Sequence, residues 1–287
     1  MRPQLHQKPS LKITVDGFEE EELFIHTMEG SEAFSELFKY KLTVFSTKIM
    51  EPKDLLGKEI AVELFDDGAS QRHVNGIATS FSFSGVVGTP KEAYSYHVTL
   101  SPQLWLTTRS ERCRVFRDKS PVTIITSILD EWQISYNCEG LHKAYVNYDQ
   151  HVQYQESDFD YLKRLMAHEG IFFYFTHKQG KHTLHLADAN PSSPTPSVFS
   201  FHPTWRQAGM IHRWKVSETL DHHQVHLADY NYQAFQDPHL KKTNTLQESS
   251  LDDALANLMS ATHFGAYRHV SDRGEMMRNV RNEFLSA

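Results

Sequence analysis

The chain has 287 residues, 39% of them hydrophobic and 12% aromatic, which can bury a substantial core and suggests about two domains at roughly 150 residues each. Its 29 Lys and Arg against 36 Asp and Glu give a net charge of −7, which argues against a protein built to neutralise nucleic-acid phosphates. The longest purely apolar run, Ile171 to Phe175, has five residues. A membrane-spanning helix needs about 20, so we expect no membrane insertion.

The N-terminal segment and the cysteines indicate a compartment. The first ten residues, MRPQLHQKPS, lack the apolar stretch of a signal peptide, so we expect the chain to be made in the cytoplasm. Cys113 and Cys138 are the two cysteines, which excludes a disulfide framework. A single bond between them stays open, but two reduced thiols are favoured.

The first hundred residues are typical of strands. Apolar and polar residues alternate, and turn signals such as Asp16-Gly17 and Asp67-Gly68 interrupt them. The alternating runs are LKITV, LFKYKLTVFS, EIAVELF, HVNGIATSFSFSG and AYSYHVTLS. Strands of this length and spacing predict an antiparallel barrel or sandwich.

The hydrophobic period then changes. Ser120-Pro121 is typical of a helix start, and apolar residues at helical spacing predict a helix of about 12 residues. A polar stretch and a strand-like run, VNYDQHVQYQ, follow. Ser157 then begins a second helix, 158–168, which Gly170 ends. The next run, IFFYFTHKQGKHTLHLAD, predicts a hairpin about His177–Gly180.

The last third alternates between breakers, strands and a helix. Residues 190–197, NPSSPTPS, predict a loop, and residues 210–220 and 223–235 predict strands. A third helix is expected over 250–265, and a short one over 274–287. Long blocks of strands argue against a doubly wound parallel sheet.

Motifs for chemistry are missing. The sequence has no C-x-x-C, no common phosphate loop and no G-x-S-x-G nucleophile elbow. It has 18 histidines, but close pairs such as His182 and His185 fall on opposite faces of a strand and cannot easily share a metal. We therefore assign no catalytic, metal-binding or cofactor-binding residue, and expect no cofactor and no enzyme activity.

A basic cluster is the one group of residues with a candidate role. Only Phe116 is interleaved with it, whereas nucleic-acid binding uses several stacking aromatics. Arginine suits ion pairs at interfaces, so a strand edge or subunit contact is the better interpretation. The candidate interface residues are Arg109, Arg112, Arg114, Arg117 and Lys119.

Two long segments carry a family resemblance. They are residues 105–132, WLTTRSERCRVFRDKSPVTIITSILDEW, and residues 152–188, VQYQESDFDYLKRLMAHEGIFFYFTHKQGKHTLHLAD. Together with FSELFKYKLTVFS and ADYNYQAF, they resemble VgrG, the spike protein family of type VI secretion systems. These are long, ordered matches, so they are more specific than any short motif.

The resemblance implies a mainly β fold with helices (α+β), built from two antiparallel β-barrels of phage tail hub type. We expect a first barrel over 1–107, a helical connecting segment over 108–150, a second barrel over 151–240 containing helix 158–168, and a C-terminal helical segment over 241–287. Family members continue into a spike domain, for which this sequence has no room, so we expect it to be cut before the spike.

The resemblance also implies a function. Three copies form a ring that matches the hexameric tube of Hcp, so we expect a structural hub at the base of a puncturing tip. Partners are then a homotrimer, the Hcp hexamer, the C-terminal spike domain, and effectors or tip proteins, with injection through the apparatus on firing. Alternatives are a tail-associated cell-wall hydrolase or an effector- or carbohydrate-binding adaptor. Besides residues 109–119, strands near 38–45 and 225–235 are candidate interface segments.

Overall fold

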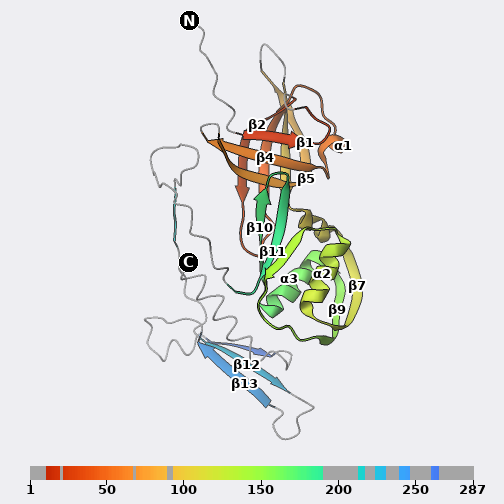
Figure 1. Cartoon of the computed structure of the whole chain (residues 1–287), viewed down its shortest axis with the longest axis vertical. Helices are drawn as coiled ribbons and strands as arrows, with labels where there is room; N and C mark the ends of the chain where they lie inside the picture. Colours follow the sequence, from red (N-terminus) through yellow and green to blue (C-terminus); the bar gives the residue numbers. More distant parts are fainter. Residues whose placement is uncertain are drawn as a thin grey trace. The chain divides into compact units, whose positions relative to one another are not determined.

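A computed structural model describes residues 11–19, 22–66, 69–88, 93–189, 213–216, 224–230, 239–245 and 260–264. These residues are mainly strands with short helices, which confirms the predicted fold class (Figure 1). The chain divides into two compact units, one of Met1–Ala167 with Ile171–Asp188 and one of His168–Gly170 with Ala189–Ala287. The expected two-barrel arrangement and the division into four segments stay predictions.

A six-stranded antiparallel sheet occupies the first part of the first unit, in the order β1-β4-β5-β6-β3-β2. Its end strands contact each other, as in an incompletely closed barrel. The alternating runs of the sequence are confirmed as strands, whereas β2 corresponds to none of them. The strands are β1 (Leu11–Val15), β2 (Leu23–Ser31), β3 (Lys39–Ser46), β4 (Glu59–Asp66), β5 (Ala69–Val87) and β6 (Ala93–Ser101), with helix α1 (Pro52–Leu55) between β3 and β4.

The core of this sheet follows from the alternation. Val44, Val62 and Leu100 are completely buried, and each comes from a different strand. Burying one such side chain stabilises the fold by roughly 1.5–3 kcal/mol. A one-residue slip in register would expose all of them, so the hydrophobic pattern specifies the pairing.

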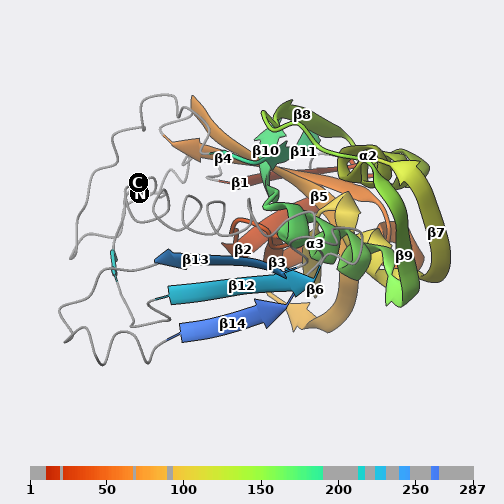
Figure 2. The ribbon, with the colours of Figure 1, turned by 90° about the horizontal axis from the view of Figure 1, so that it is seen from below.

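Two helices and two smaller sheets complete the first unit. The helices α2 (Pro121–Glu131) and α3 (Asp158–Glu169) share one hydrophobic core, and Figures 1 and 2 show the ribbon β7–β9 beside them. None of the helices in the described ranges is long and apolar enough to cross a membrane. The other elements are η1 (Gln103–Arg109), β7 (Glu111–Lys119), β8 (Tyr136–Gly140), β9 (Tyr148–Ser157), β10 (Phe172–Lys178) and β11 (Lys181–Ala187).

The local signals for these helices and the hairpin are confirmed. The Ser120 hydroxyl accepts a hydrogen bond from the Thr123 N–H at 3.1 Å, and the Ser157 hydroxyl accepts one from the Asp160 N–H at 3.0 Å. Both are N-caps. Gly170 ends α3 with a φ of 69°, a conformation that glycine adopts without penalty. The hairpin β10–β11 is antiparallel and turns between Lys178 and Lys181.

The strand β8 differs from expectation. The sequence predicts a polar connection here, but the residues pair in parallel with β11, so this sheet is not purely antiparallel. A parallel pair needs a long crossover, and here the chain passes through β9, α3 and β10 between the two strands. That partner is remote in sequence, which is why local patterns do not show it.

The second unit contains a three-stranded sheet in the order β13-β12-β14. Its strands are β12 (Gln224–Tyr230), β13 (His239–Thr245) and β14 (Ser260–Phe264). The strand predicted over 223–235 is confirmed at β12. The helix predicted over 250–265 is wrong at β14, because these residues pair in parallel with β12, and such pairing overrides weak local propensity.

Other predictions in this unit fall largely outside the described residues. Of the strand expected over 210–220, residues 213–216 are described and are not in a strand. The loop expected over 190–197 and the helix expected over 274–287 lie outside the described ranges.

Candidate functional site

The basic cluster lies on β7, whose side chains alternate between two environments. Arg112, Arg114 and Phe116 are half-buried, whereas Cys113, Val115 and Arg117 are exposed. Among the described strands, β7 pairs with β9 alone, in a two-stranded sheet. One face of this ribbon covers α2 and α3, and the other faces outward. The five predicted interface residues therefore do not share one surface.

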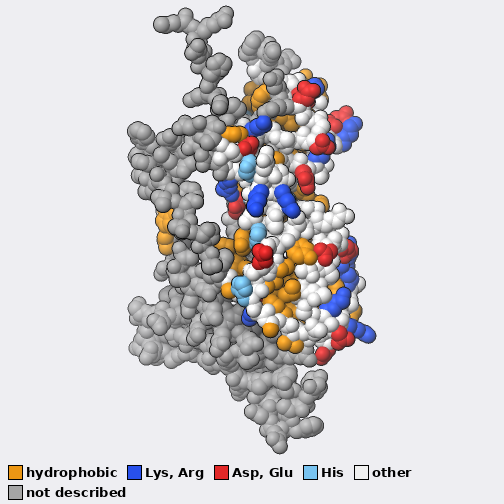
Figure 3. Space-filling view, in the orientation of Figure 1, with side chains coloured by type: hydrophobic (Ala, Val, Ile, Leu, Met, Phe, Trp, Pro, Cys, Tyr) orange, Lys and Arg blue, Asp and Glu red, His pale blue; other side chains and the backbone are white. Residues whose placement is uncertain are grey.

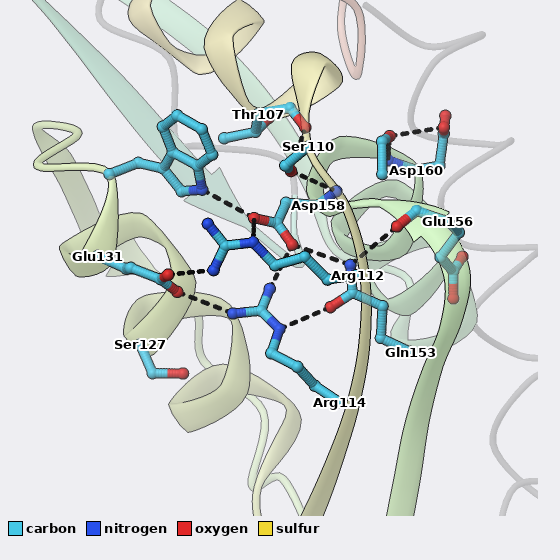
Figure 4. A network of polar contacts seen from close by, with 12 residues as sticks. Thr107, Ser110, Arg112, Arg114, Ser127, Glu131, Gln153, Glu156, Asp158 and Asp160 are labelled. Atoms are coloured by element: carbon cyan, nitrogen blue, oxygen red, sulfur yellow. Dashed lines mark hydrogen bonds and ion pairs between the residues drawn. The ribbon is translucent and has the colours of Figure 1, made fainter.

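The inward arginines converge on Asp158, the first residue of α3, whose side chain is completely buried (Figure 4). Arg114 Nη2 is paired with Asp158 Oδ1, and Arg112 Nε lies 3.5 Å from Oδ2. The Trp132 indole Nε1 donates to Oδ2 at 2.8 Å, and Gln153 Nε2 donates to Oδ1 at 2.9 Å. Both oxygens of the buried carboxylate thus accept a hydrogen bond and lie near an arginine, as a buried charge requires.

Glu131, the last residue of α2, extends the network towards solvent. Arg114 Nη1 donates to Glu131 Oε2 at 2.8 Å, and Arg112 Nη1 pairs with Oε1. Arg114 also uses its Nε to donate to Gln153 Oε1 at 2.8 Å. The two guanidiniums therefore tie β7 to the end of α2, to β9 and to the start of α3.

The electrostatics of the network favour ionised carboxylates. Burial alone raises the pKa of Asp158, but hydrogen bonds from Gln153 and Trp132 and the charge of Arg114 outweigh it and hold that pKa below its ordinary value. The hydrogen bond from Arg112 lowers the pKa of Glu131. Neither carboxyl group is poised to donate a proton near neutral pH, so the network holds structure together and has no feature of a general acid.

The remaining predicted interface residues lie at the margins of β7. The Arg109 guanidinium stacks on the Trp105 ring, 4.5 Å from its centre, and Lys119 Nζ lies 5.9 Å from the centre of Phe116. Arg117 is exposed on the outward face. The interface role of all five residues stays a prediction, but Arg112 and Arg114 have a structural role as well.

In the described residues of the two other candidate interface segments, the strand edges are occupied. The strand β3 lies between β6 and β2, and β12 lies between β13 and β14. Their backbones are paired on both sides, so neither offers a free edge for another chain.

A second polar cluster, which the sequence patterns do not predict, lies where the hairpin β10–β11 meets the six-stranded sheet. The Asn75 N–H donates to His177 Nδ1 at 3.1 Å, and the Gln103 N–H donates to His182 Nε2 at 3.1 Å. The two rings lie 6.2 Å apart, and both contact Phe38. Burial lowers the pKa of His177, and burial together with His177 lowers that of His182 to about 4.

One predicted histidine arrangement and the state of the two cysteines can be compared with the structure. His182 faces Phe38, whereas His185 stacks on Tyr174, so the two lie on opposite faces of β11. Cys113 and Cys138 are free thiols. Within the described ranges, no three His, Cys, Asp or Glu side chains are grouped to hold a metal ion.

Figure 3 shows charges of both signs scattered over the drawn face of the first unit, with no single-sign patch. Comparison with known proteins identifies the family of the chain. Residues 31–287 match the model of the phage tail baseplate hub (GPD) family. The chain belongs to this family.

Its relatives include spike proteins. Over 222 residues, 74% of this chain, it is 35% identical to the type VI secretion system spike protein VgrG1b of Pseudomonas aeruginosa. Over 95% of the chain it is 28% identical to the actin cross-linking toxin VgrG1 of Vibrio cholerae. The resemblance to VgrG is thus confirmed. The chain spans 29% of the first relative and 26% of the second.

A solved structure supports the fold. The E. coli c3393 protein is a type VI secretion component with structural similarity to the T4 bacteriophage tail proteins gp27 and gp5. It matches with a TM-score of 0.56 and 23% identity, over 67% of this chain and 52% of that one. At this identity the likeness concerns the fold alone.

Proposed function

We propose that this hub-family chain is a structural part of the puncturing tip of a type VI secretion apparatus, where it docks a spike onto the Hcp tube. The observation that carries the proposal is the family match over residues 31–287 together with 35% identity to a type VI spike protein. The half-buried arginines of β7 support it, because Arg112 and Arg114 fix the fold and do not build a reactive site.

The proposed partners follow from this role. Three copies form a homotrimeric ring, one face of the ring contacts the Hcp hexamer, and the other carries a spike domain with effectors or tip proteins. The chain resides in the cytoplasm until firing and then leaves through the apparatus. Arg117 and Lys119, which are exposed on or next to the outward face of the β7–β9 ribbon, are the members of the basic cluster best placed to meet a neighbour.

Secretion of the tube protein tests the proposal. Deleting the gene that encodes this chain should abolish release of Hcp into the medium of cells that have an active apparatus, and a plasmid copy should restore it. Undiminished release in the deletion strain contradicts the hub role. Peptidoglycan turnover by the purified chain would favour the cell-wall hydrolase instead.

A further inference from the structure

The long strand β5 changes partners along its length. Its first half, to Ile77, pairs with β4, and its second half, from Ile77 to Val87, pairs with β6. The last bonds on the β4 side lie at Ala78, whose carbonyl accepts from the Gly57 N–H at 2.9 Å and whose N–H donates to the Lys58 carbonyl at 3.0 Å. The strand β4 begins at Glu59 and is preceded by α1, so it does not extend along the rest of β5.

Residues Ser80–Val87 therefore have one edge that no described strand pairs with. Among the described residues, no backbone hydrogen bond reaches them from the side opposite β6. In an antiparallel pair, alternate residues direct their N–H and C=O groups away from the partner. These groups are a template on which another strand can pair.

The side chains of this edge do not prevent it from pairing with another strand. Natural edge strands are protected from pairing by charged residues, above all Lys, or by Pro within the strand. From His73 to Pro90 the sequence has no Asp, Glu, Lys or Arg. Three apolar side chains of the segment are exposed instead, Phe83 by 58%, Val86 by 54% and Val87 by 45%.

The Phe83 ring extends the core towards this edge. Phe81 stacks on Tyr96 with 5.0 Å between ring centres, and Phe83 lies 5.5 Å from the same ring. Tyr96 and Phe81 are buried or half-buried, whereas Phe83 is more than half exposed. An added strand would cover Phe83 and continue an aromatic row that ends at Phe83 among the described residues.

We infer that the free edge Ser80–Val87 pairs with a β-strand of a second copy of this chain. The inference rests on the proposed homotrimer. Each copy carries a net charge of −7, so two copies repel at long range, and an uncharged edge lets two backbones approach without a like-charge penalty. In a ring, a head-to-tail contact closes after the last subunit and leaves no edge exposed.

Bulges make this edge suited to a curved assembly. The register of β5 against β6 shifts between Ala78 and Ser80 and again between Phe83 and Gly85. Each bulge bends the strand and increases its twist. A partner strand must follow that curve, which a neighbouring subunit of a small ring does.

A pair of lysine variants tests the inference. Ser82 and His97 are exposed and lie directly opposite each other on β5 and β6, but β6 is paired on both sides. Light scattering over a tenfold concentration range should show a trimer for the unchanged chain. Ser82→Lys should raise the dissociation constant of the assembly at least about tenfold, because the contact must then desolvate an ammonium group. His97→Lys should change that constant less than about threefold.

Hydrogen exchange gives a direct readout of backbone pairing. In the trimer, the outward amides of Ser80–Val87 should exchange at least about tenfold more slowly than in Ser82→Lys, because pairing protects them. A trimer whose Ser80–Val87 amides exchange freely, equal effects of the two variants, or a monomer at every concentration would each overturn the inference. Hcp release from cells is measured separately, so failure of the edge contact is distinguishable from failure of the hub role.

Discussion

The indole Nε1 of Trp132 donates a hydrogen bond of 2.8 Å to Oδ2 of Asp158, which joins the C-terminal end of α2 to the first residue of α3. The same carboxylate receives Arg114 from β7. Three elements thus meet at one buried negative charge, and their mutual orientation depends on it.

Removing the Asp158 carboxylate should strongly destabilise the chain. Asp158→Ala leaves Arg114 without its buried partner, and breaking such a pair costs about 3–5 kcal/mol. Chemical denaturation measures the loss. Glu156→Ala is the control, because it removes a carboxylate 2.5 Å from a half-exposed Arg164 and should cost less than about 1 kcal/mol. Equal losses would show that the buried network has no special role.

Arg112 and Arg117 should respond differently to charge reversal. Arg112→Glu places a carboxylate against Asp158 and Glu131 and should destabilise the fold by at least about 2 kcal/mol. Arg117→Glu, on the exposed face of β7, should change the free energy of unfolding by less than about 0.5 kcal/mol and weaken assembly. Denaturation and light scattering separate the two effects. Unchanged assembly in Arg117→Glu contradicts an interface role for that residue.

The histidine cluster predicts acid sensitivity. The pKa of His182 is lowered from 6.5 to about 4, so the unfolded chain binds the proton first as pH falls. The stabilisation from neutral His182 is therefore complete above pH 6.5 and is lost progressively between pH 6.5 and about 4. The lowered pKa of His177 acts in the same direction. Unfolding free energies measured across this range should fall with pH.

His182→Gln provides the matched variant for this pH dependence. Its amide oxygen can still accept the Gln103 N–H bond that His182 accepts now, but it does not titrate. The variant should therefore have a flatter stability profile between pH 6.5 and 4. The same slope in both proteins would assign the acid sensitivity to other groups.

Gly76 should not tolerate a methyl group. A Cβ at this position would lie 2.7 Å from the Ser101 carbonyl oxygen, which belongs to the backbone of β6. Gly76→Ala should therefore destabilise the chain by about 1–3 kcal/mol, measured as a shift in the denaturation midpoint. Ser82→Ala, at an exposed position further along β5, is the control and should have little effect. If Gly76→Ala leaves the free energy of unfolding unchanged, the two strands can move apart there without loss of stability.

The Ser120 cap should contribute a smaller amount. Ser120→Ala removes the acceptor of the Thr123 N–H at the start of α2, and loss of an N-cap costs about 1 kcal/mol. Ser120→Asp retains an acceptor and should retain most of the stability. Denaturation of the three proteins compares them, and an equal loss in both variants would contradict a capping role.

Much of the first unit could be predicted from the sequence, because its signals are local. The alternation in LKITV and KYKLTVFS specifies which face of each strand is buried, and a period of two needs no knowledge of the partner. Ser120, Ser157 and Gly170 mark helix ends through bonds and conformations within a few residues. The family resemblance added the hub fold.

Only the tertiary structure decided which segments meet. The Asn75–His177 bond joins residues 102 positions apart, and the Gln103–His182 bond joins residues 79 positions apart. Contacts between remote segments also decide three other features. These are the parallel pairing of β8, the strand β14 and the burial of Asp158. A periodic pattern predicts which face of a segment is buried. It does not predict which other segment covers that face, because the hydrophobic effect is non-directional. The partner is selected by hydrogen bonds and shape that exist only once distant segments are together.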